Sequence, residues 1–361
     1  MKKKVGIVTF HKAHNYGALL QAYALKKTLE RLNLNVVFID FDNDSLDKNY
    51  RLFPKLSNSS LSYNIKQIIK TLLDFNRKFK RNNSFNEFIK NYLHSFSINK
   101  SKLKLDVVFL GSDQIWNPNI TGQLEPIFFG QHPNLDVDKV VSYAASMGNG
   151  MNKLNINDEF KKLLLGVDSL GVREKALKTI LHENFDINCQ QNLDPTLLLN
   201  KSDWDELADD SETSQNKYIL IYEVEKHPHT QAVVNHIKAV SNYDVLVVSA
   251  KTSHLVDKSV ITSASPRRFV SLFKNASFVV TTSFHGTVFS IINNIPFYTL
   301  KFGDGIDNRS AGLLAMLDLS DRHIKDESQI KEHVVDFTNA NRLLELERNT
   351  SIEYITDNLR K

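Results

Sequence analysis

Short apolar runs alternate with amphipathic segments along most of the chain, and this alternation limits the possible folds more than any other feature. Residues 4–10 (KVGIVTF) have the length and β-branched content of a buried strand, and residues 36–41 (VVFIDF) repeat that pattern. Between them, residues 18–33 place apolar side chains at helical spacing. A strand–helix–strand unit of this kind predicts parallel pairing with a right-handed crossover.

The second half of the chain repeats the alternation, so a length of 361 residues predicts two doubly wound α/β domains that face a cleft. The acidic, weakly apolar stretch 201–217 marks the expected boundary. We predict an N-terminal α/β domain over 1–205, a C-terminal α/β domain over 206–335 and a terminal helix over 336–361. Further strands are predicted at 106–112, 140–146, 169–174, 218–224, 244–250, 277–283 and 295–300, and further helices from Lys175, at 230–242 and at 266–276.

Residues 44–100 interrupt this rhythm and predict a helical insertion in the first domain. Their apolar side chains keep helical spacing at Ile65, Ile68, Ile69, Leu72 and Leu73. Asp74 is the single acid opposed to a run of basic residues: Lys66, Lys70, Arg77, Lys78, Lys80 and Arg81. Two interpretations remain open, namely a packed helix with a solvated basic face and a surface that contacts an anionic lipid carrier or a membrane.

Composition excludes several classes of protein. A net charge of +4 without a long basic block argues against a nucleic-acid partner and fits an anionic ligand. Cys189 is the only cysteine, so neither an internal disulfide nor a cysteine metal cluster can form. The first apolar run is too short for a signal peptide, and no stretch is long enough to span a bilayer. A cytoplasmic protein is expected.

Three loops directly follow predicted strands, where parallel sheets bind their ligands. In the first, Asn15, Tyr16 and Gly17 stand at the start of a helix, whose free backbone N–H groups favour an anion. The loop matches neither the dinucleotide-binding glycine pattern nor the phosphate-binding loop of nucleotide hydrolases. An asparagine cap with a glycine turn is the structural alternative.

The second loop, residues 111–118 (GSDQIWNP), combines polar side chains with an aromatic ring. The face of Trp116 could stack on a sugar ring, Asp113 could accept hydroxyl protons, and Ser112 adds a further polar contact. The alternative is a capped helix start with Trp116 in the core.

The third loop leaves a buried strand at Ser283 and His285, and Gly286 and Thr287 are expected to begin the next helix. Backbone donors of 286–288 would then point at an anion, while His285 supplies a charge or a proton. A structural histidine is the alternative. Convergence of all three loops in one cleft would favour function, because structural caps need not share one location.

Two arginines could add positive charge to such a cleft. Arg173 follows the predicted strand at 169–174, and Arg309 precedes a further probable helix. A guanidinium group suits a carboxylate or phosphate because it binds two oxygens at once. We assign no metal, since no spacing typical of metal ligands is present, and no serine-hydrolase elbow appears.

Several of these strings together resemble the polysaccharide pyruvyl transferase family. They are HNYGALLQAYAL (14–25), GSDQIWNP (111–118), SYAASMG (142–148), VREK (172–175), DPTLLL (194–199) and SFHGTVFSIINNIPF (283–297). The resemblance implies a B-type glycosyltransferase-like fold whose terminal helix crosses back onto the first domain. It also implies transfer of the pyruvyl group of phosphoenolpyruvate to two hydroxyls of a sugar in a bacterial surface polysaccharide or its precursor.

The resemblance suggests roles for individual residues and partners. His285 would be the acid and, with the helix start, the phosphate ligand; Arg173 would bind the carboxylate or phosphate; Asp113 would be the base. Phosphoenolpyruvate is the donor substrate, no cofactor is expected, and the acceptor is a sugar or a lipid-linked oligosaccharide, in the latter case at the inner face of the membrane. Some members have Arg-x-His where this chain has Ser283–Phe284–His285, so Arg309 or Lys301 would have to compensate.

Two other functions suit the same scaffold. One is a glycosyltransferase that uses a nucleotide sugar, and the other is a non-catalytic protein that binds glycan or phosphate.

Overall fold

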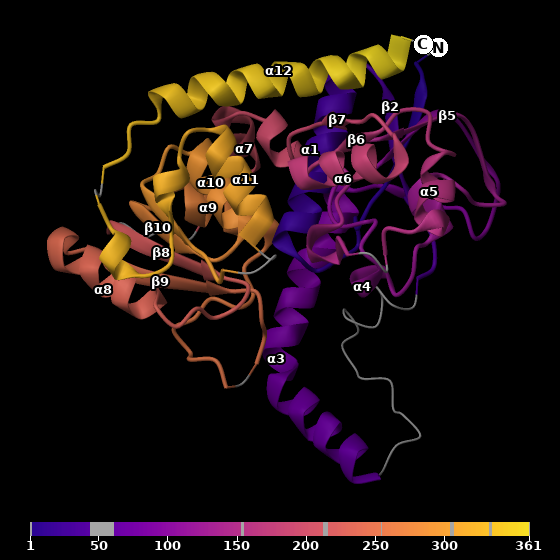
Figure 1. Cartoon of the computed structure of the whole chain (residues 1–361). Helices are drawn as coiled ribbons and strands as arrows, with labels where there is room; N and C mark the ends of the chain where they lie inside the picture. Colours follow the sequence, from indigo (N-terminus) through magenta and orange to yellow (C-terminus); the bar gives the residue numbers. More distant parts are fainter. Residues whose placement is uncertain are drawn as a thin grey trace.

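Two parallel sheets, one from each half of the chain, form the framework of the molecule (Figure 1). The computed structural model describes residues 2–43, 61–152, 155–211, 216–253, 255–303, 307–331 and 334–360, and within 61–67 only the backbone. The predicted helical insertion therefore lies partly outside the described residues, at 44–60, as does part of the predicted domain boundary, at 212–215.

Each sheet has five strands, and every pairing within it is parallel. The first sheet has the order β3-β2-β1-β4-β5 and the second the order β12-β11-β10-β8-β9. The predicted pair of doubly wound α/β domains is confirmed. The strands of the first sheet are β1 (Lys4–Val8), β2 (Asn35–Asp40), β3 (Ser95–Ser97), β4 (Leu103–Leu110) and β5 (Leu135–Ser142). Those of the second are β8 (Tyr218–Glu223), β9 (Asp244–Ser249), β10 (Phe278–Thr281), β11 (Phe297–Leu300) and β12 (His323–Ile324).

The helices cover the faces of these sheets and connect their strands. They are α1 (Tyr16–Arg31), α3 (Leu61–Tyr92), α4 (Pro118–Thr121), α5 (Asp158–Leu164), α6 (Lys175–Phe185), α7 (Lys201–Leu207), α8 (Thr230–Ser241), α9 (Pro266–Lys274), α10 (Phe284–Ile292), α11 (Asn308–Met316) and α12 (Thr338–Arg360). The strand predicted at 169–174 is reduced to β6 (Gly171–Val172), which pairs with β7 (Gln190–Gln191) in a small separate sheet.

Strand order reverses at one point in each sheet. In the first, β1 lies between β2 and β4, and in the second, β8 lies between β9 and β10. Chain segments that leave such neighbouring strands diverge to opposite faces, which opens a crevice at the carboxyl ends of the strands. The loops after β1, β4, β8 and β10 are therefore the places where this topology positions a ligand.

One apolar core joins the two domains. Helix α1 is buried on most of its surface because it lies between the domains, where the Tyr16 ring stacks on Phe269 at a centroid distance of 4.3 Å. The same cluster includes Leu20 from α1, Phe109 from the first sheet and Phe289 from α10. Continuous packing of this kind holds the domains in a fixed relation and so fixes the shape of the crevice.

Helix α12 runs back across both domains, and the two chain ends lie side by side (Figure 1). Its Ile355 side chain is fully buried, the Tyr354 hydroxyl donates to the Ser142 carbonyl at 3.0 Å, and Arg348 donates to the Leu197 carbonyl at 2.8 Å. The expected return of the terminal helix onto the first domain is confirmed. No helix in the described ranges is long and apolar enough to cross a bilayer.

Candidate functional site

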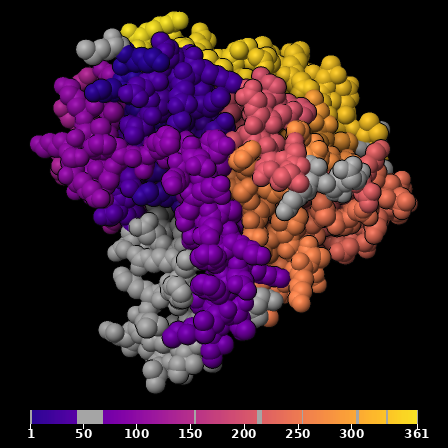
Figure 2. Space-filling model, turned by 180° about the vertical axis from the view of Figure 1, so that it is seen from behind, coloured from indigo at the N-terminus to yellow at the C-terminus, as the bar shows by residue number. Residues whose placement is uncertain are grey.

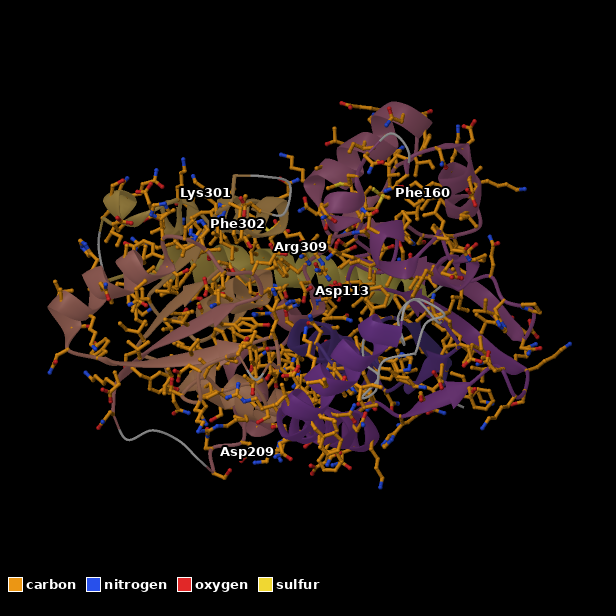
Figure 3. The ribbon with its side chains drawn as sticks, turned by 90° about the horizontal axis from the view of Figure 1, so that it is seen from below. Asp113, Phe160, Asp209, Lys301, Phe302 and Arg309 are labelled. Atoms are coloured by element: carbon orange, nitrogen blue, oxygen red, sulfur yellow. The ribbon has the colours of Figure 1, made fainter. Side chains whose placement is uncertain are left out.

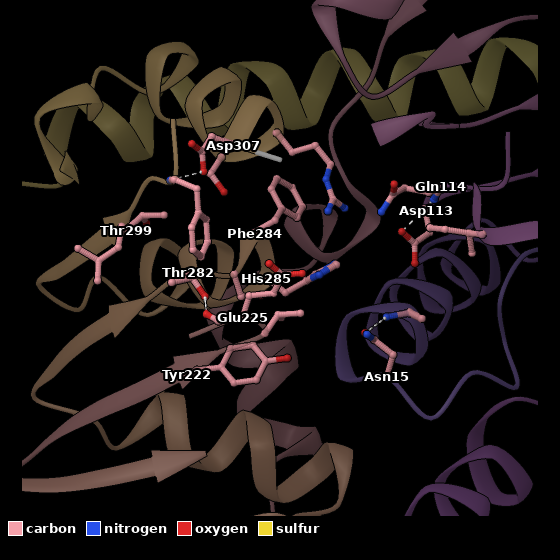
Figure 4. A pocket seen from close by; sticks show the side chains of 18 of the residues that line it. Asn15, Asp113, Gln114, Tyr222, Glu225, Thr282, Phe284, His285, Thr299 and Asp307 are labelled. Atoms are coloured by element: carbon pink, nitrogen blue, oxygen red, sulfur yellow. Dashed lines mark hydrogen bonds between the residues drawn. The ribbon is translucent and has the colours of Figure 1, made fainter. Parts of the chain in front are cut away.

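A cavity of about 240 Å³ lies between the two domains, at the carboxyl ends of their strands. Figure 3 shows Asp113 of the first domain and Arg309 of the second near each other at the junction of the two halves. The close view in Figure 4 shows the polar lining residues converging from both sides. The lining includes Asn15 after β1, Asp113 and Gln114 after β4, Tyr222 and Glu225 at the end of β8, Thr282, Ser283, Phe284 and His285 after β10, and Asp307 and Arg309 before and in α11.

His285 lies in the first turn of α10, and its ring is held between α1 and the Asp194 carboxylate. A Cβ atom at Gly17 would stand 2.1 Å from His285 Nδ1, so only glycine at this position lets the ring approach α1. On the other side, the buried Nε2 atom lies 3.7 Å from Asp194 Oδ2. Gly17 thus belongs to the site as a packing residue.

The Asp194 side chain is fully buried between Arg173 and His285. Its Oδ2 atom is 2.8 Å from Arg173 Nη2, and its Oδ1 atom accepts hydrogen bonds from the Thr196 N–H and hydroxyl groups. Burial would raise the pKa of Asp194, but Arg173, together with His285 and Thr196, holds it well below its usual range. The Asp194 carboxylate is therefore ionised and fixes the Arg173 side chain from one side.

Arg173 and Arg309 approach the same aromatic ring from different domains. Their guanidinium carbons lie 5.4 and 5.5 Å from the Phe284 ring centroid. Burial and the nearby positive charge of Arg173 lower the pKa of Arg309. Arg173 Nε and Nη1 are buried and have no hydrogen-bond partner within the described part of the chain. Two neighbouring guanidinium groups, of which that of Arg173 has unsatisfied N–H groups, form a site that a small anion would stabilise.

A second cavity of about 270 Å³ shares Phe284 and Arg309 with the first. Its polar lining includes Arg173, Glu174 and Asn192. Burial raises the pKa of Glu174, and the Asn192 amide is buried with no hydrogen-bond partner among the described residues. The two cavities together offer hydrogen-bond donors on both sides of the Phe284 ring.

The wall from the first domain combines apolar side chains with three polar ones, Asn15, Asp113 and Gln114. Asn15 caps α1, since its Oδ1 atom accepts from the Ala18 N–H group at 3.2 Å. Asp113 has a left-handed backbone with φ of 74°, and its Oδ1 atom accepts from the Gln114 N–H group at 2.9 Å. Both side chains keep acceptor capacity that sugar hydroxyls could use.

Six predicted binding residues do not line the cavity, namely Tyr16, Gly17, Ser112, Trp116, Gly286 and Thr287. Trp116 is 1% exposed, stacks on Phe129 and donates its Nε1–H group to the Phe128 carbonyl, so it is a core residue and cannot serve as a sugar platform. Tyr16 is buried at the domain interface, where its hydroxyl donates to the Ala264 carbonyl at 2.9 Å. Ser112 is buried behind the cavity and contacts Arg173.

The backbone at 286–288 does not form the predicted anion site. Helix α10 begins at Phe284, two residues earlier than expected. The Gly286 N–H group donates to Ser283 Oγ at 3.4 Å, and the Thr287 N–H group donates to the Ser283 carbonyl at 3.0 Å. These N–H groups already have acceptors within the loop and the first helical turn, so they do not point at an anion. The Thr287 side chain is buried, and its Oγ1 atom lies 2.7 Å from Thr299 Oγ1.

Sequence reasoning missed Asp194, Glu225 and Gln114. Glu225 follows β8, so the rule that selected the other strand ends would have found it. Asp194 carried one signal, a lone carboxylate between the apolar residue Leu193 and Pro195. Across the described ranges, no three His, Cys, Asp or Glu side chains come together as metal ligands would.

The chain is similar in structure to several solved proteins. The chain resembles the structure of UDP-GlcNAc 2-epimerase from Neisseria meningitidis bound to UDP-GlcNAc, with 13% identity, 99% of each chain covered and a TM-score of 0.47. It also resembles the UDP-GlcNAc 2-epimerase from Methanocaldococcus jannaschii (14% identity, 100% and 99% covered, TM-score 0.46) and UGT89C1 from Arabidopsis thaliana (9% identity, 98% of each covered, TM-score 0.48). No curated protein matches the sequence.

The sequence profile described as polysaccharide pyruvyl transferase matches residues 15–301, which begin at Asn15 and include the loops after β4, β8 and β10. The match also includes Arg173, Asp194 and His285 and stops before Arg309. This chain is a transferase that belongs to the polysaccharide pyruvyl transferase family.

Proposed function

We propose that this protein transfers the pyruvyl group of phosphoenolpyruvate to two hydroxyl groups of a sugar in a bacterial surface polysaccharide or its precursor. The observation that carries the proposal is the pair of guanidinium groups at Phe284, 5.4 and 5.5 Å from its ring centroid, beside a cavity whose opposite wall carries Asp113. Phosphoenolpyruvate has two anionic groups, a phosphate and a carboxylate, and suits such a pair. The sugar hydroxyls suit Asp113, Glu225 and Asn15.

In this proposal Arg309 supplies the positive charge that a basic residue at the position of Ser283 would supply. It comes from α11 instead of the strand end, yet its guanidinium group lies over the ring of Phe284, the residue between Ser283 and His285. The donor phosphate would bind Arg309 and His285, and its carboxylate would bind the free N–H groups of Arg173. No cofactor is required, because the donor itself supplies the activated group.

The reaction balances with one acid and one base. A protonated His285 gives its proton to the methylene carbon of the enol, and a sugar hydroxyl oxygen bonds to the resulting cationic carbon while Asp113 accepts the hydroxyl proton. The second hydroxyl bonds to the same carbon as the carbon–oxygen bond to phosphate breaks. Asp113 then passes the first hydroxyl proton to the departing phosphate, and the second hydroxyl proton restores the protonated His285.

The test is incubation with phosphoenolpyruvate and a panel of sugars and lipid-linked sugars, with phosphate release and product mass as readouts. We expect phosphate release that depends on the acceptor and a ketal product. Arg309→Gln should raise KM for phosphoenolpyruvate, and His285→Asn should lower kcat by about 10²–10⁴-fold. Arg342→Gln, at an exposed arginine of α12, is the matched control and should leave both constants unchanged.

Two outcomes would overturn the proposal. Stabilisation by a nucleoside diphosphate but not by phosphoenolpyruvate would indicate a glycosyltransferase that uses a nucleotide sugar. Binding of phosphoenolpyruvate or glycan without turnover, unaffected by His285→Asn, would indicate a binding protein.

A further inference from the structure

Helix α3 projects from the body of the molecule (Figures 1 and 2). Eleven large apolar side chains are strongly exposed in the described residues, and five of them lie on this helix. They are Ile68 (43% exposed), Ile69 (52%), Leu72 (64%), Leu73 (59%) and Phe79 (43%). Clustered exposure of this kind marks an interaction surface, whereas scattered apolar residues are ordinary.

Helix α3 exposes its apolar side and buries its polar side. Its polar side faces the protein: Thr71 and Asp74 are buried, and Arg77 donates to the carbonyls of Ser253 and Val256, each at 2.7 Å. An amphipathic helix on a soluble body would place the opposite face inward. The apolar face of α3 is therefore directed toward another apolar medium.

The contacts of Arg77 place Ser253 and Val256 of the second domain on the polar side of α3. We call the exposed apolar face the α3 patch and define it as Ile68, Ile69, Lys70, Leu72, Leu73, Phe79 and Lys80. Leu255 and Lys258, which lie near these two residues in the sequence, are also exposed.

The charges around the α3 patch are mainly positive. Lys70, Lys80 and Lys258 are exposed, Asp74 is buried, and the exposed Asp257 accepts the hydrogen bonds of Ser259. Apolar side chains flanked by lysines match the boundary between acyl chains and anionic headgroups, where ammonium groups remain at the surface. A second copy of the chain would instead bring two positive surfaces together.

We propose that the α3 patch binds the surface of an anionic lipid bilayer. Bilayer binding there would bring the cavity close to the membrane, because α3 also contacts the loop that carries Asn15. Arg81 of α3 donates to the His14 carbonyl at 3.2 Å and to the Tyr16 hydroxyl at 3.2 Å. The proposal does not depend on the reaction, since bilayer binding needs neither donor nor acceptor.

Vesicle flotation tests the proposal directly. The full chain should float with vesicles of phosphatidylcholine mixed with phosphatidylglycerol, less with phosphatidylcholine alone, and less as salt increases. Leu72→Glu/Leu73→Glu should weaken binding to the mixed vesicles by at least about tenfold. Lys70→Glu/Lys80→Glu should weaken it by more than about tenfold, since each lysine near the surface contributes about fivefold.

Matched controls keep the test decisive. Val240→Glu and Leu346→Glu change apolar residues that are 64% and 54% exposed on α8 and α12, away from the α3 patch, and should bind vesicles as the unchanged chain does. All variants should keep the melting temperature, because the changed side chains are exposed. Absence of vesicle binding, equal binding by Leu72→Glu/Leu73→Glu, or a dimer in sedimentation that this variant dissociates would each overturn the proposal.

Discussion

At the scale of single residues, the Asp194 carboxylate organises the cationic side of the site. It lies 2.8 Å from Arg173 and 3.7 Å from His285, and it is fully buried. Without it, the Arg173 guanidinium would be an uncompensated charge in the interior, which typically costs about 3–5 kcal/mol. We therefore regard Asp194 as a positioning residue that acts through the two side chains it contacts.

The depressed pKa of Asp194 predicts acid sensitivity of the fold. A carboxyl group with a lower pKa in the folded than in the unfolded protein contributes stability above its unfolded pKa of about 3.9 and loses that contribution as the pH falls below it. The free energy of unfolding, measured with denaturant, should thus decrease below about pH 4. Asp194→Asn should be destabilised at neutral pH and show less of this decrease.

The exposed ion pair of Lys104 and Asp136 provides the control. Its atoms are 3.9 Å apart, and its side chains are 74% and 68% exposed, so Asp136→Asn should change stability little at any pH. An unchanged acid profile in Asp194→Asn would contradict the role of the buried pair.

The sequence predicted some of the cavity-lining residues correctly and others wrongly. Asn15, Asp113 and His285 were selected because each follows a predicted strand, and the structure brings all three to one cavity. Trp116 was selected by the same rule but points into the core. Periodicity locates the end of a strand, whereas the direction of each side chain in the following loop depends on packing with segments distant in sequence.

At the scale of elements, the start of α10 shows how a local signal serves the site. Ser283 has an extended backbone and accepts the N–H group of Gly286, which is the geometry of an N-cap. The cap turns the chain sharply after β10 and so directs His285 toward Asp194. In this one loop the structure combines a helix cap with cavity-lining side chains.

Loss of this cap should lower the free energy of unfolding. Ser283→Ala should reduce the free energy of unfolding by about 1 kcal/mol, because the Gly286 N–H group loses its acceptor in a buried position. Ser283→Thr keeps the hydroxyl and should recover most of the loss. Equal destabilisation of both variants in denaturant unfolding would contradict the capping role.

At the scale of the whole molecule, α3 connects the domains to each other. The Arg81 side chain donates to the Thr262 carbonyl of the second domain at 3.1 Å and to His14 and Tyr16 of the first. Its guanidinium group also lies 4.5 Å from the Phe85 ring centroid. Within the described side chains the basic run on α3 is thus divided: Arg77 and Arg81 bind the body, Lys78 lies 4.0 Å from the buried Asp74, and Lys70 and Lys80 remain at the surface.

This division predicts unequal effects of neighbouring substitutions. Arg81→Ala should lower the free energy of unfolding by about 3 kcal/mol, because it leaves buried acceptors in both domains without a donor. Lys80→Ala, one residue away and exposed, should change it by less than about 0.5 kcal/mol. Similar values for the two variants in denaturant unfolding would show that Arg81 does not link the domains.

The sequence by itself determined the two parallel sheets, most of their strands and the loops that carry the site. These features follow from periodicity and from the rule that parallel strands end at one edge, and both are local or topological. Only the tertiary structure decided that Asp194 lies between Arg173 and His285, that Arg309 approaches Phe284, and that α3 turns its apolar face outward. Such contacts join segments far apart in the chain, so their partners are selected by the packing of the whole molecule and not by the pattern of any one segment.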